Sequence, residues 1–444
     1  MSSWVIPLYL LACLLVGGSS DAPRQDAFLQ ILAILLIGWT AVVYRPSTLA
    51  PGAKPLLVLT ALAVALPLLQ LIPLSPEIWK SLPGRESVAL GFATLGYPAP
   101  SLPLSLTPWR TLNSAYALLP PIAVMLAIMA LRTHRERWIA GTIVAGALAS
   151  VILGALQSTS AGPQSWTYIY KYTNPGAVGF FANRNHMATL LLAALPFAGA
   201  LFAAGHPHIR SRTAALAMTA AGAGGVLLIL VGLVLNGSLA ALALAVPVVT
   251  FSILLLPFGW QLRRIVIPVA AMAFVLSLGV LANSWAGSVV AGNPQLDSVY
   301  SRGQIWALTF KAVAQTFPVG TGLGSFTSVY VLHENPATVT VAWVNHAHND
   351  YIELLLETGL AGLLLGVAFL SWFAVQVVRT WRSPFSTLFG KAATIAASAI
   401  LAHSIVDYPL RTAAIAAVFG ACLGMMAGPP RQGRSDEARH VRIA

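Results

Sequence analysis

Apolar stretches close to the length of a membrane-spanning helix recur along this 444-residue chain, and they limit its possible folds more than any other feature. The hydrocarbon core of a bilayer is crossed by a helix of about 20 apolar residues. Twelve stretches near this length occur, at residues 3–17, 27–44, 55–74, 112–131, 138–157, 186–204, 213–235, 238–256, 265–286, 351–378, 391–407 and 409–427. Backbone polar groups inside lipid must be paired within the chain, so we expect α-helices. The sequence therefore predicts an all-α polytopic membrane protein with about 12 transmembrane helices.

The composition agrees with a membrane protein and argues against several other classes. Hydrophobic residues make up 57% of the chain and charged residues only 9%, and the mean hydropathy is +0.78. A soluble domain carries roughly a quarter charged residues. The two cysteines, Cys13 and Cys422, both lie in apolar stretches, which indicates neither a disulfide framework nor a zinc site.

The positive charges predict an orientation in the membrane. Most of the 25 Lys and Arg residues fall on the cytoplasmic side if both termini are placed in the cytoplasm. This asymmetry also explains the pI near 10.1 without a nucleic-acid partner. Residues 1–286 then hold helices 1 to 9, with outer excursions at 75–111 and 158–185. An outer loop follows at 287–350. Helices 10 to 12 lie in 351–427, and a cytoplasmic tail occupies 428–444. Residues 301–317 of the outer loop have the pattern of a helix lying in the membrane interface.

A polar cluster stands at the entrance to the tenth predicted span. It contains His346, His348, Asn349 and Asp350. Helical spacing places four charged or titratable side chains on one face: His346, Asp350, Glu353 and Glu357. Gly359, Gly362 and Gly366 follow as a stripe on which a neighbouring helix is expected to pack closely. Charge at the mouth of a membrane helix is costly and indicates a functional site, although a polar helix cap is the plainer alternative.

Two arginines meet the membrane on the same outer side as His348. Arg184 precedes the sixth span and Arg302 opens the interfacial helix. Guanidinium groups bind phosphate oxygens bidentately, so the set suits a diphosphate-bearing lipid. An imidazole is able to take a proton from an attacking hydroxyl. Singly, such an arginine is more often a headgroup anchor and such a histidine a structural hydrogen-bond partner.

Two further readings concern charges near this site. Asp407 and Arg411 stand four residues apart on the outer side, where they form a local ion pair or complete the cation cluster. His346, His348 and Asp350 are candidate ligands for a divalent ion, but residues two apart in a helix point to different faces. We therefore expect neither a metal nor a cofactor.

Several segments, taken together, resemble one family. The pattern of His348-Asn349 followed by Gly359 and Gly362 resembles the signature of the bacterial O-antigen ligase and O-antigen polymerase superfamily. SRGQIWALTFKAVAQTFPVGTGLGSF, FFANRNHMA and AHSIVDYPLRT are similar to other blocks of that family, in the expected order. Together the segments span residues 181–412, and the hydropathy profile extends the likeness to the whole chain.

The resemblance implies a fold and a chemistry. It implies a type C glycosyltransferase architecture in the bacterial inner membrane, with the outer side facing the periplasm and undecaprenyl-diphosphate-linked glycan as donor. Arg184 and Arg302 would hold the donor diphosphate, and His348 would be the catalytic histidine. Transfer would proceed without metal and with inversion. The residues expected to support this site are Asn349, Glu357, Glu353, His346, Asp407 and Arg411, of which Glu357 or Glu353 is the candidate to orient His348.

The sequence does not determine the acceptor or the chemical role of His348. A ligase moves the glycan onto lipid A core, whereas a polymerase moves it onto another repeat unit. A polysaccharide-lipid transporter is the alternative of a different class, but transporters carry ionisable residues at mid-membrane in broken helices. Here the charges gather at one face, which favours an enzyme. His348 acts either as a general base or as a cation that binds diphosphate.

Overall fold

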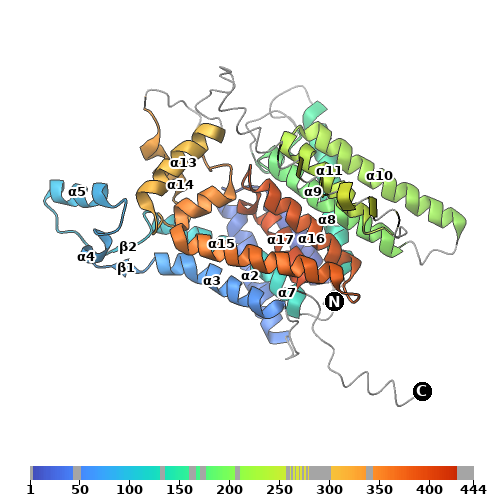
Figure 1. Ribbon diagram of the computed structural model, residues 1–444, viewed down its shortest axis with the longest axis horizontal. Helices are drawn as coiled ribbons and strands as arrows, with labels where there is room; N and C mark the ends of the chain where they lie inside the picture. The colour runs from blue at the N-terminus through green and yellow to red at the C-terminus, as the bar shows by residue number, and fades with distance from the viewer. Residues whose placement is uncertain are drawn as a thin grey trace, which may run out of the picture.

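The computed structural model is a bundle of α-helices (Figure 1). It describes residues 4–43, 52–130, 136–159, 167–170, 177–205, 211–256, scattered residues between 261 and 279, 302–336 and 344–427. The predicted span at 265–286 falls largely outside these residues, as do the part of the outer loop at 287–301 and the tail at 428–444.

Seven helices of the described residues are long and apolar enough to cross a membrane. They are α2 (Pro23–Val43), α3 (Ala53–Gln70), Pro108–Ala130, α8 (Glu136–Thr159), α9 (Arg184–Gly205), α10 (Arg212–Asn236) and α15 (Asp350–Arg382). The third combines α6 (Pro108–Ala117) with α7 (Leu119–Ala130). Shorter apolar helices are α1 (Val5–Val16), α5 (Glu86–Leu95), α11 (Leu239–Ile253), α16 (Leu388–His403) and α17 (Ala413–Met426). The all-α polytopic class is confirmed, and the count of 12 and the orientation stay predictions.

Helix α9 is the most buried of the seven candidate spans. Its residues are buried along most of its length, and it packs against α8, α10, α11 and α16. Many of its side chains are alanines, whose small size lets neighbouring helices approach closely. On the other side of the bundle, α7 packs against α2 and α17. The N-terminus of α9 is consequently fixed from several sides, which matters because Arg184 and His186 lie there.

The excursion at 75–111 projects from one edge of the bundle (Figure 1). It carries α4 (Pro76–Trp79) and α5, and its strand β2 (Leu102–Pro103) pairs antiparallel with β1 (Pro73–Leu74), which directly precedes the excursion. Arg85 is buried and donates hydrogen bonds to the carbonyl oxygens of Leu104 (2.5 Å) and Gly320 (3.3 Å). The excursion is thereby tied to the outer loop.

The described part of the outer loop contains α13 (Arg302–Thr316), α14 (Phe326–Tyr330) and the 3-10 turn η3 (Val331–His333). A tight turn joins α13 to α14. Its Gly320, Gly322 and Gly324 have φ of 83°, 99° and 80°, a region that other L-residues avoid. Arg302 therefore stands at the start of a helix that is anchored at its far end.

The predicted glycine stripe on α15 does not pack a neighbouring helix. Gly359 interrupts the helix with φ 57° and ψ −141°, and a Cβ there would overlap the carbonyl oxygen of Pro318. Leu360 N–H donates to that same oxygen at 2.8 Å. A Cβ at Gly362 would meet Thr358 of its own helix, and one at Gly366 would meet nothing within 4 Å among the described residues. Gly359 thus makes room for the loop backbone at Pro318, a contact that helical spacing does not predict.

Candidate functional site

Four segments that are distant in sequence meet around one buried carboxylate. They are the first turn of α9, the first residue of α13, the turn before α15, and the turn that joins α16 to η4 (Pro409–Arg411). The carboxylate is that of Asp407, which is fully buried. Its Oδ1 lies 3.6 Å from His348 Nδ1 and 3.7 Å from His186 Nε2, and its Oδ2 lies 3.8 Å from an Arg302 nitrogen. We call these four residues the Asp407 cluster.

The charge of Asp407 is maintained by its neighbours. Burial would raise the pKa of this carboxyl group, but His186 and His348 beside it lower the pKa well below the usual value. The backbone N–H of Tyr408 also donates to Oδ1 at 2.8 Å. Asp407 is therefore a fixed carboxylate that favours positive charge on the groups around it.

The turn that carries His348 is held in an unusual backbone conformation. His348 has φ 50°, which is uncommon for a residue other than glycine and is found at functional sites. The preceding residue, Ala347, is held at both ends: its N–H donates to Glu353 Oε2 at 2.8 Å, and its carbonyl accepts from Trp306 Nε1 at 2.9 Å. The following residue, Asn349, caps α15 by accepting from the N–H groups of Tyr351 and Ile352. Asn349 thus supports the site through the backbone.

The ring of His348 is the partly accessible imidazole of the Asp407 cluster. Its side chain is 26% exposed, whereas that of His186 is 2% exposed. Because Nδ1 of His348 faces Asp407, Nε2 lies on the opposite edge of the ring. The two atoms lie 3.6 Å apart, which is longer than a hydrogen bond, so Asp407 acts on this ring as a nearby negative charge. The geometry therefore suits proton transfer at Nε2.

Tyr408 holds three histidines together. Its ring lies 4.8 Å from that of His186, 4.2 Å from that of His346 and 5.0 Å from that of His348, measured between centroids. Its hydroxyl accepts from Asn183 Nδ2 (3.4 Å) and Asn345 Nδ2 (3.2 Å). Sequence reasoning did not single out Tyr408 or these asparagines, although Tyr408 directly follows Asp407 in VDYPLR.

A second ionic cluster lies on α15, on the face that helical spacing predicted. Arg411 reaches Asp350 at 3.6 Å, Glu353 at 3.2 Å and Glu357 at 3.1 Å. The expected pairing of Arg411 with Asp407 is therefore not found. Burial lowers the pKa of Arg411, but these carboxylates outweigh burial and raise it above its usual value. The guanidinium group joins α15 to the turn before α17.

Neither glutamate of α15 contacts His348, which corrects the expectation that one of them orients it. Glu353 Oε1 lies 2.8 Å from Nδ1 of His346, and Glu357 Oε1 accepts from the N–H of Phe326 at 3.2 Å. The carboxylate that faces His348 is Asp407. Burial lowers the pKa of His346, and although Glu353 opposes this shift the neutral ring is favoured.

The two predicted diphosphate-binding arginines differ in their surroundings: Arg302 belongs to the Asp407 cluster, and the Arg184 side chain lies near the turn after α10. Arg302 contacts Asp407 directly, and 40% of its side chain is exposed. Arg184 opens α9 two residues before His186, and its carbonyl accepts from Asn236 Nδ2 at 2.7 Å. Its guanidinium group lies near Gly237, at the turn between α10 and α11.

The described residues contain no group of three or more His, Cys, Asp or Glu side chains arranged to hold a metal ion. His346 and His348, the two histidines of the candidate metal site, face different carboxylates.

These features define a class of protein: a polytopic membrane protein with a buried carboxylate, histidines and arginines gathered at helix ends. Residues 224–367 match the family described as O-antigen ligase. This match supports the O-antigen ligase and polymerase superfamily, and it confirms the resemblance that the motifs indicate. The matched region contains Arg302 and His348 but neither Arg184 nor Asp407. No curated protein matches the chain.

Proposed function

We propose that the protein is a glycosyltransferase that moves a glycan from an undecaprenyl-diphosphate-linked donor to a hydroxyl of lipid A core, at the periplasmic face of the bacterial inner membrane. The observation that carries this proposal is the Asp407 cluster. It combines a partly exposed imidazole, a fixed carboxylate and an accessible guanidinium group at the ends of apolar helices. Lipid-linked glycans are the general substrates of the superfamily.

The donor diphosphate is assigned to Arg184 and Arg302. Both arginines stand at the first residue of a helix, α9 and α13, where backbone N–H groups and the helix dipole favour anions. Among the described residues, Arg302 contacts one carboxylate, that of Asp407, at a distance of 3.8 Å. Its remaining N–H groups suit the phosphate oxygens.

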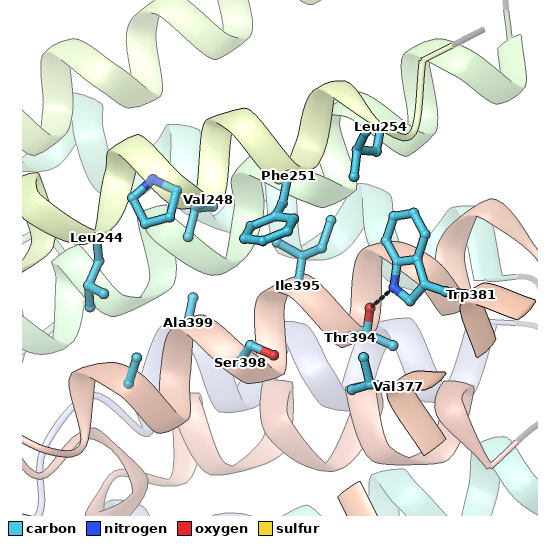
Figure 2. Close-up of a pocket in the computed structure, with 12 residues that line it drawn as sticks. Leu244, Val248, Phe251, Leu254, Val377, Trp381, Thr394, Ile395, Ser398 and Ala399 are labelled. Atoms are coloured by element: carbon cyan, nitrogen blue, oxygen red, sulfur yellow. Dashed lines mark hydrogen bonds between the residues drawn. The ribbon is translucent and has the colours of Figure 1, made fainter. Parts of the chain in front are cut away.

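The lipid portion of the donor is assigned to an apolar groove. Figure 2 shows this groove between α11 and α16, with Leu244 and Phe251 facing Ile395 and Ala399. Its volume is about 310 Å³, and it reaches Ala402, which precedes His403 at the end of α16 near the Asp407 cluster. Ser398→Trp, which fills the groove, should raise the KM for donor and leave the KM for acceptor unchanged. An unchanged donor KM would remove the groove from the proposal.

His348 is assigned the role of general base. Nε2 takes the proton from the acceptor hydroxyl, whose oxygen attacks the anomeric carbon on the face opposite the diphosphate. The bond from that carbon to the diphosphate oxygen breaks, and the diphosphate leaves with the electron pair and is stabilised by the arginines. Attack from the opposite face inverts the anomeric carbon. Asp407 stabilises the imidazolium ion that forms, and the proposed step uses no metal or cofactor.

A polymerase of the same superfamily is the second candidate, because it uses the same donor chemistry. The description of the matched family as O-antigen ligase favours the ligase. Lipopolysaccharide from a strain that lacks the gene separates the candidates on a gel. Unligated lipid-linked polymer indicates a ligase, a core with one repeat indicates a polymerase, and normal lipopolysaccharide would contradict both.

The purified protein then tests the chemistry. It should transfer glycan in excess chelator and yield the inverted anomer. Loss of transfer in chelator, restored by one divalent ion, would contradict the metal-free step.

A further inference from the structure

A second cavity opens beside the Asp407 cluster, in the loop between α1 and α2. Its volume is about 540 Å³, within the range of small-ligand sites. It is lined by Ser19, Asp21, Ala22, Pro23, Arg24, Gln25, Ile169, Tyr170 and Ala182. We call it the loop cavity. None of these residues has a role in the steps assigned above.

Two short connections join the loop cavity to the site. Ser20 lies between two lining residues, and its hydroxyl oxygen is 3.2 Å from Nε2 of His346. Ala182 lines the cavity, and the next residue, Asn183, donates to the hydroxyl of Tyr408. His346 and His348 both pack on Tyr408. The loop cavity therefore ends one side chain away from the rings around the proposed base.

The lining chemistry differs from that of the donor site. Asp21 and Arg24 are exposed and of opposite charge, Gln25 supplies an amide, and Asp26 follows in the first turn of α2. The Asp21 carboxylate opposes a diphosphate, whereas a mixture of donors and acceptors suits the hydroxyl groups of a sugar. A cavity of this kind is poorly suited to the anionic part of the donor.

Tyr170, the aromatic side chain in the lining of the loop cavity, is held in place. The hydroxyl of Tyr170 donates to the carbonyl oxygen of Val16, at the end of α1. A fixed aromatic face beside polar side chains offers both an apolar surface and hydrogen-bonding groups, as small-molecule sites commonly do.

We propose that the loop cavity is the acceptor subsite, which binds the terminal saccharide of the acceptor and directs its hydroxyl past His346 toward His348. The proposal rests on the glycosyl transfer proposed above. It gives the two substrates separate entrances, with the donor diphosphate at Arg184 and Arg302 and the acceptor sugar at the loop between α1 and α2. The acceptor sugar is carried by lipid A core or by a lipid-linked repeat unit, and both present the same hydroxyl chemistry.

Kinetics of the purified full-length protein test the assignment. The donor is undecaprenyl-diphosphate-linked glycan, and the acceptor is rough lipopolysaccharide in one arm and undecaprenyl-diphosphate-linked single repeat in the other. Asp21→Ala, Arg24→Ala and Gln25→Ala should each raise the acceptor KM about tenfold, the effect of one lost hydrogen bond to a charged or polar group. The donor KM should not change. The arm in which the wild type is active identifies the source of the sugar.

Matched variants outside the cavity provide the control. Glu86→Ala and Lys80→Ala remove exposed charges from the excursion at 75–111 and should change neither KM. Wild-type transfer with an unchanged acceptor KM in all three cavity variants would overturn the acceptor subsite and leave glycosyl transfer standing. A rise in the donor KM in these variants would also overturn it.

A binding measurement separates the subsite from the reaction. Both native cysteines are buried, so Gln25→Cys should be the main reactive thiol of its variant. Delipidated core oligosaccharide, or the oligosaccharide of one repeat, should protect this thiol from a thiol reagent and should not protect the exposed Ser81→Cys. Protection without transfer by the wild type would sustain the subsite and refute the proposed reaction. Lack of protection by both oligosaccharides would refute the subsite.

Discussion

Replacement of Asp407 by asparagine should lower the transfer rate by about three orders of magnitude. The two side chains have the same shape, and the amide oxygen is still able to accept from the N–H of Tyr408. What is lost is the negative charge 3.6 Å from Nδ1 of His348. With an effective dielectric constant of about 20, unit charges at that distance attract by about 4–5 kcal/mol. This attraction stabilises the imidazolium ion of the transition state, and its loss corresponds to roughly a thousandfold in rate.

The assay is single-turnover transfer with saturating donor and acceptor, so that the rate reports the chemical step. Asp350→Asn is the matched control, because it changes a half-buried carboxyl group that lies 3.6 Å from Arg411 rather than beside His348. It should retain most of the activity, since Arg411 keeps Glu353 and Glu357. Thermal unfolding establishes that both variants fold. A folded Asp407→Asn protein that transfers at the wild-type rate would refute the role of the carboxylate.

Three further predictions follow from the clusters and the orientation. Arg184→Ala and Arg302→Ala should each weaken binding of the donor diphosphate by about 1.5–3 kcal/mol for each hydrogen bond that is lost. Lysine at either position should restore transfer poorly, because it lacks the planar, forked guanidinium group. Near-normal transfer rates in both Arg→Lys proteins would show that a point charge suffices. Arg411→Met should destabilise the fold by about 3–5 kcal/mol, seen as a lower unfolding temperature, because three carboxylates lose their cation; an unchanged temperature would contradict this. Ser328 and Phe385 are both exposed, so a cysteine at either position is open to a reagent on its own side of the membrane. In the predicted orientation, Ser328→Cys should react with an impermeant thiol reagent from the periplasm and Phe385→Cys should not. The reverse pattern would overturn the orientation.

The sequence predicted the helices well because their length and apolar character are local properties. Most described apolar helices begin and end within a few residues of the predicted spans. The face of α15 that carries Asp350, Glu353 and Glu357 was also predicted, since helical periodicity places side chains three and four apart together. The structure shows that one cation, Arg411, meets all three.

The partners of those side chains were not predictable from local patterns. Asp407 was weighed as a partner of the nearby Arg411, but it faces His348, 59 residues earlier in the chain, because the turn after α16 packs against the turn before α15. The hydrogen bond from Asp350 N–H to the carbonyl of Ser404 fixes these turns together at 3.0 Å. Such pairings depend on how helices pack, which periodicity does not specify.

The kink at Gly359 illustrates the same limit. A glycine in an apolar helix is compatible with close helix packing, and that was the expectation. The residue instead adopts a positive φ that admits the backbone of Pro318 and Val319. Only the contact with a loop 40 residues earlier distinguishes the two uses of glycine.

The pH dependence of transfer by the wild-type protein tests the central claim, that His348 is the base, most directly. The pKa of Asp407 lies well below its usual range, so this carboxylate stays ionised across a neutral assay range and does not set the acid limb. With a defined undecaprenyl-diphosphate-linked donor, the rate should rise with pH on the acid side of neutrality and then level off, as expected for a base that must be deprotonated. His348→Gln should lose this limb together with roughly 10²–10⁴-fold in rate. A rate that falls as pH rises through the same range would show a diphosphate-binding cation instead, and full activity in His348→Gln would contradict both roles.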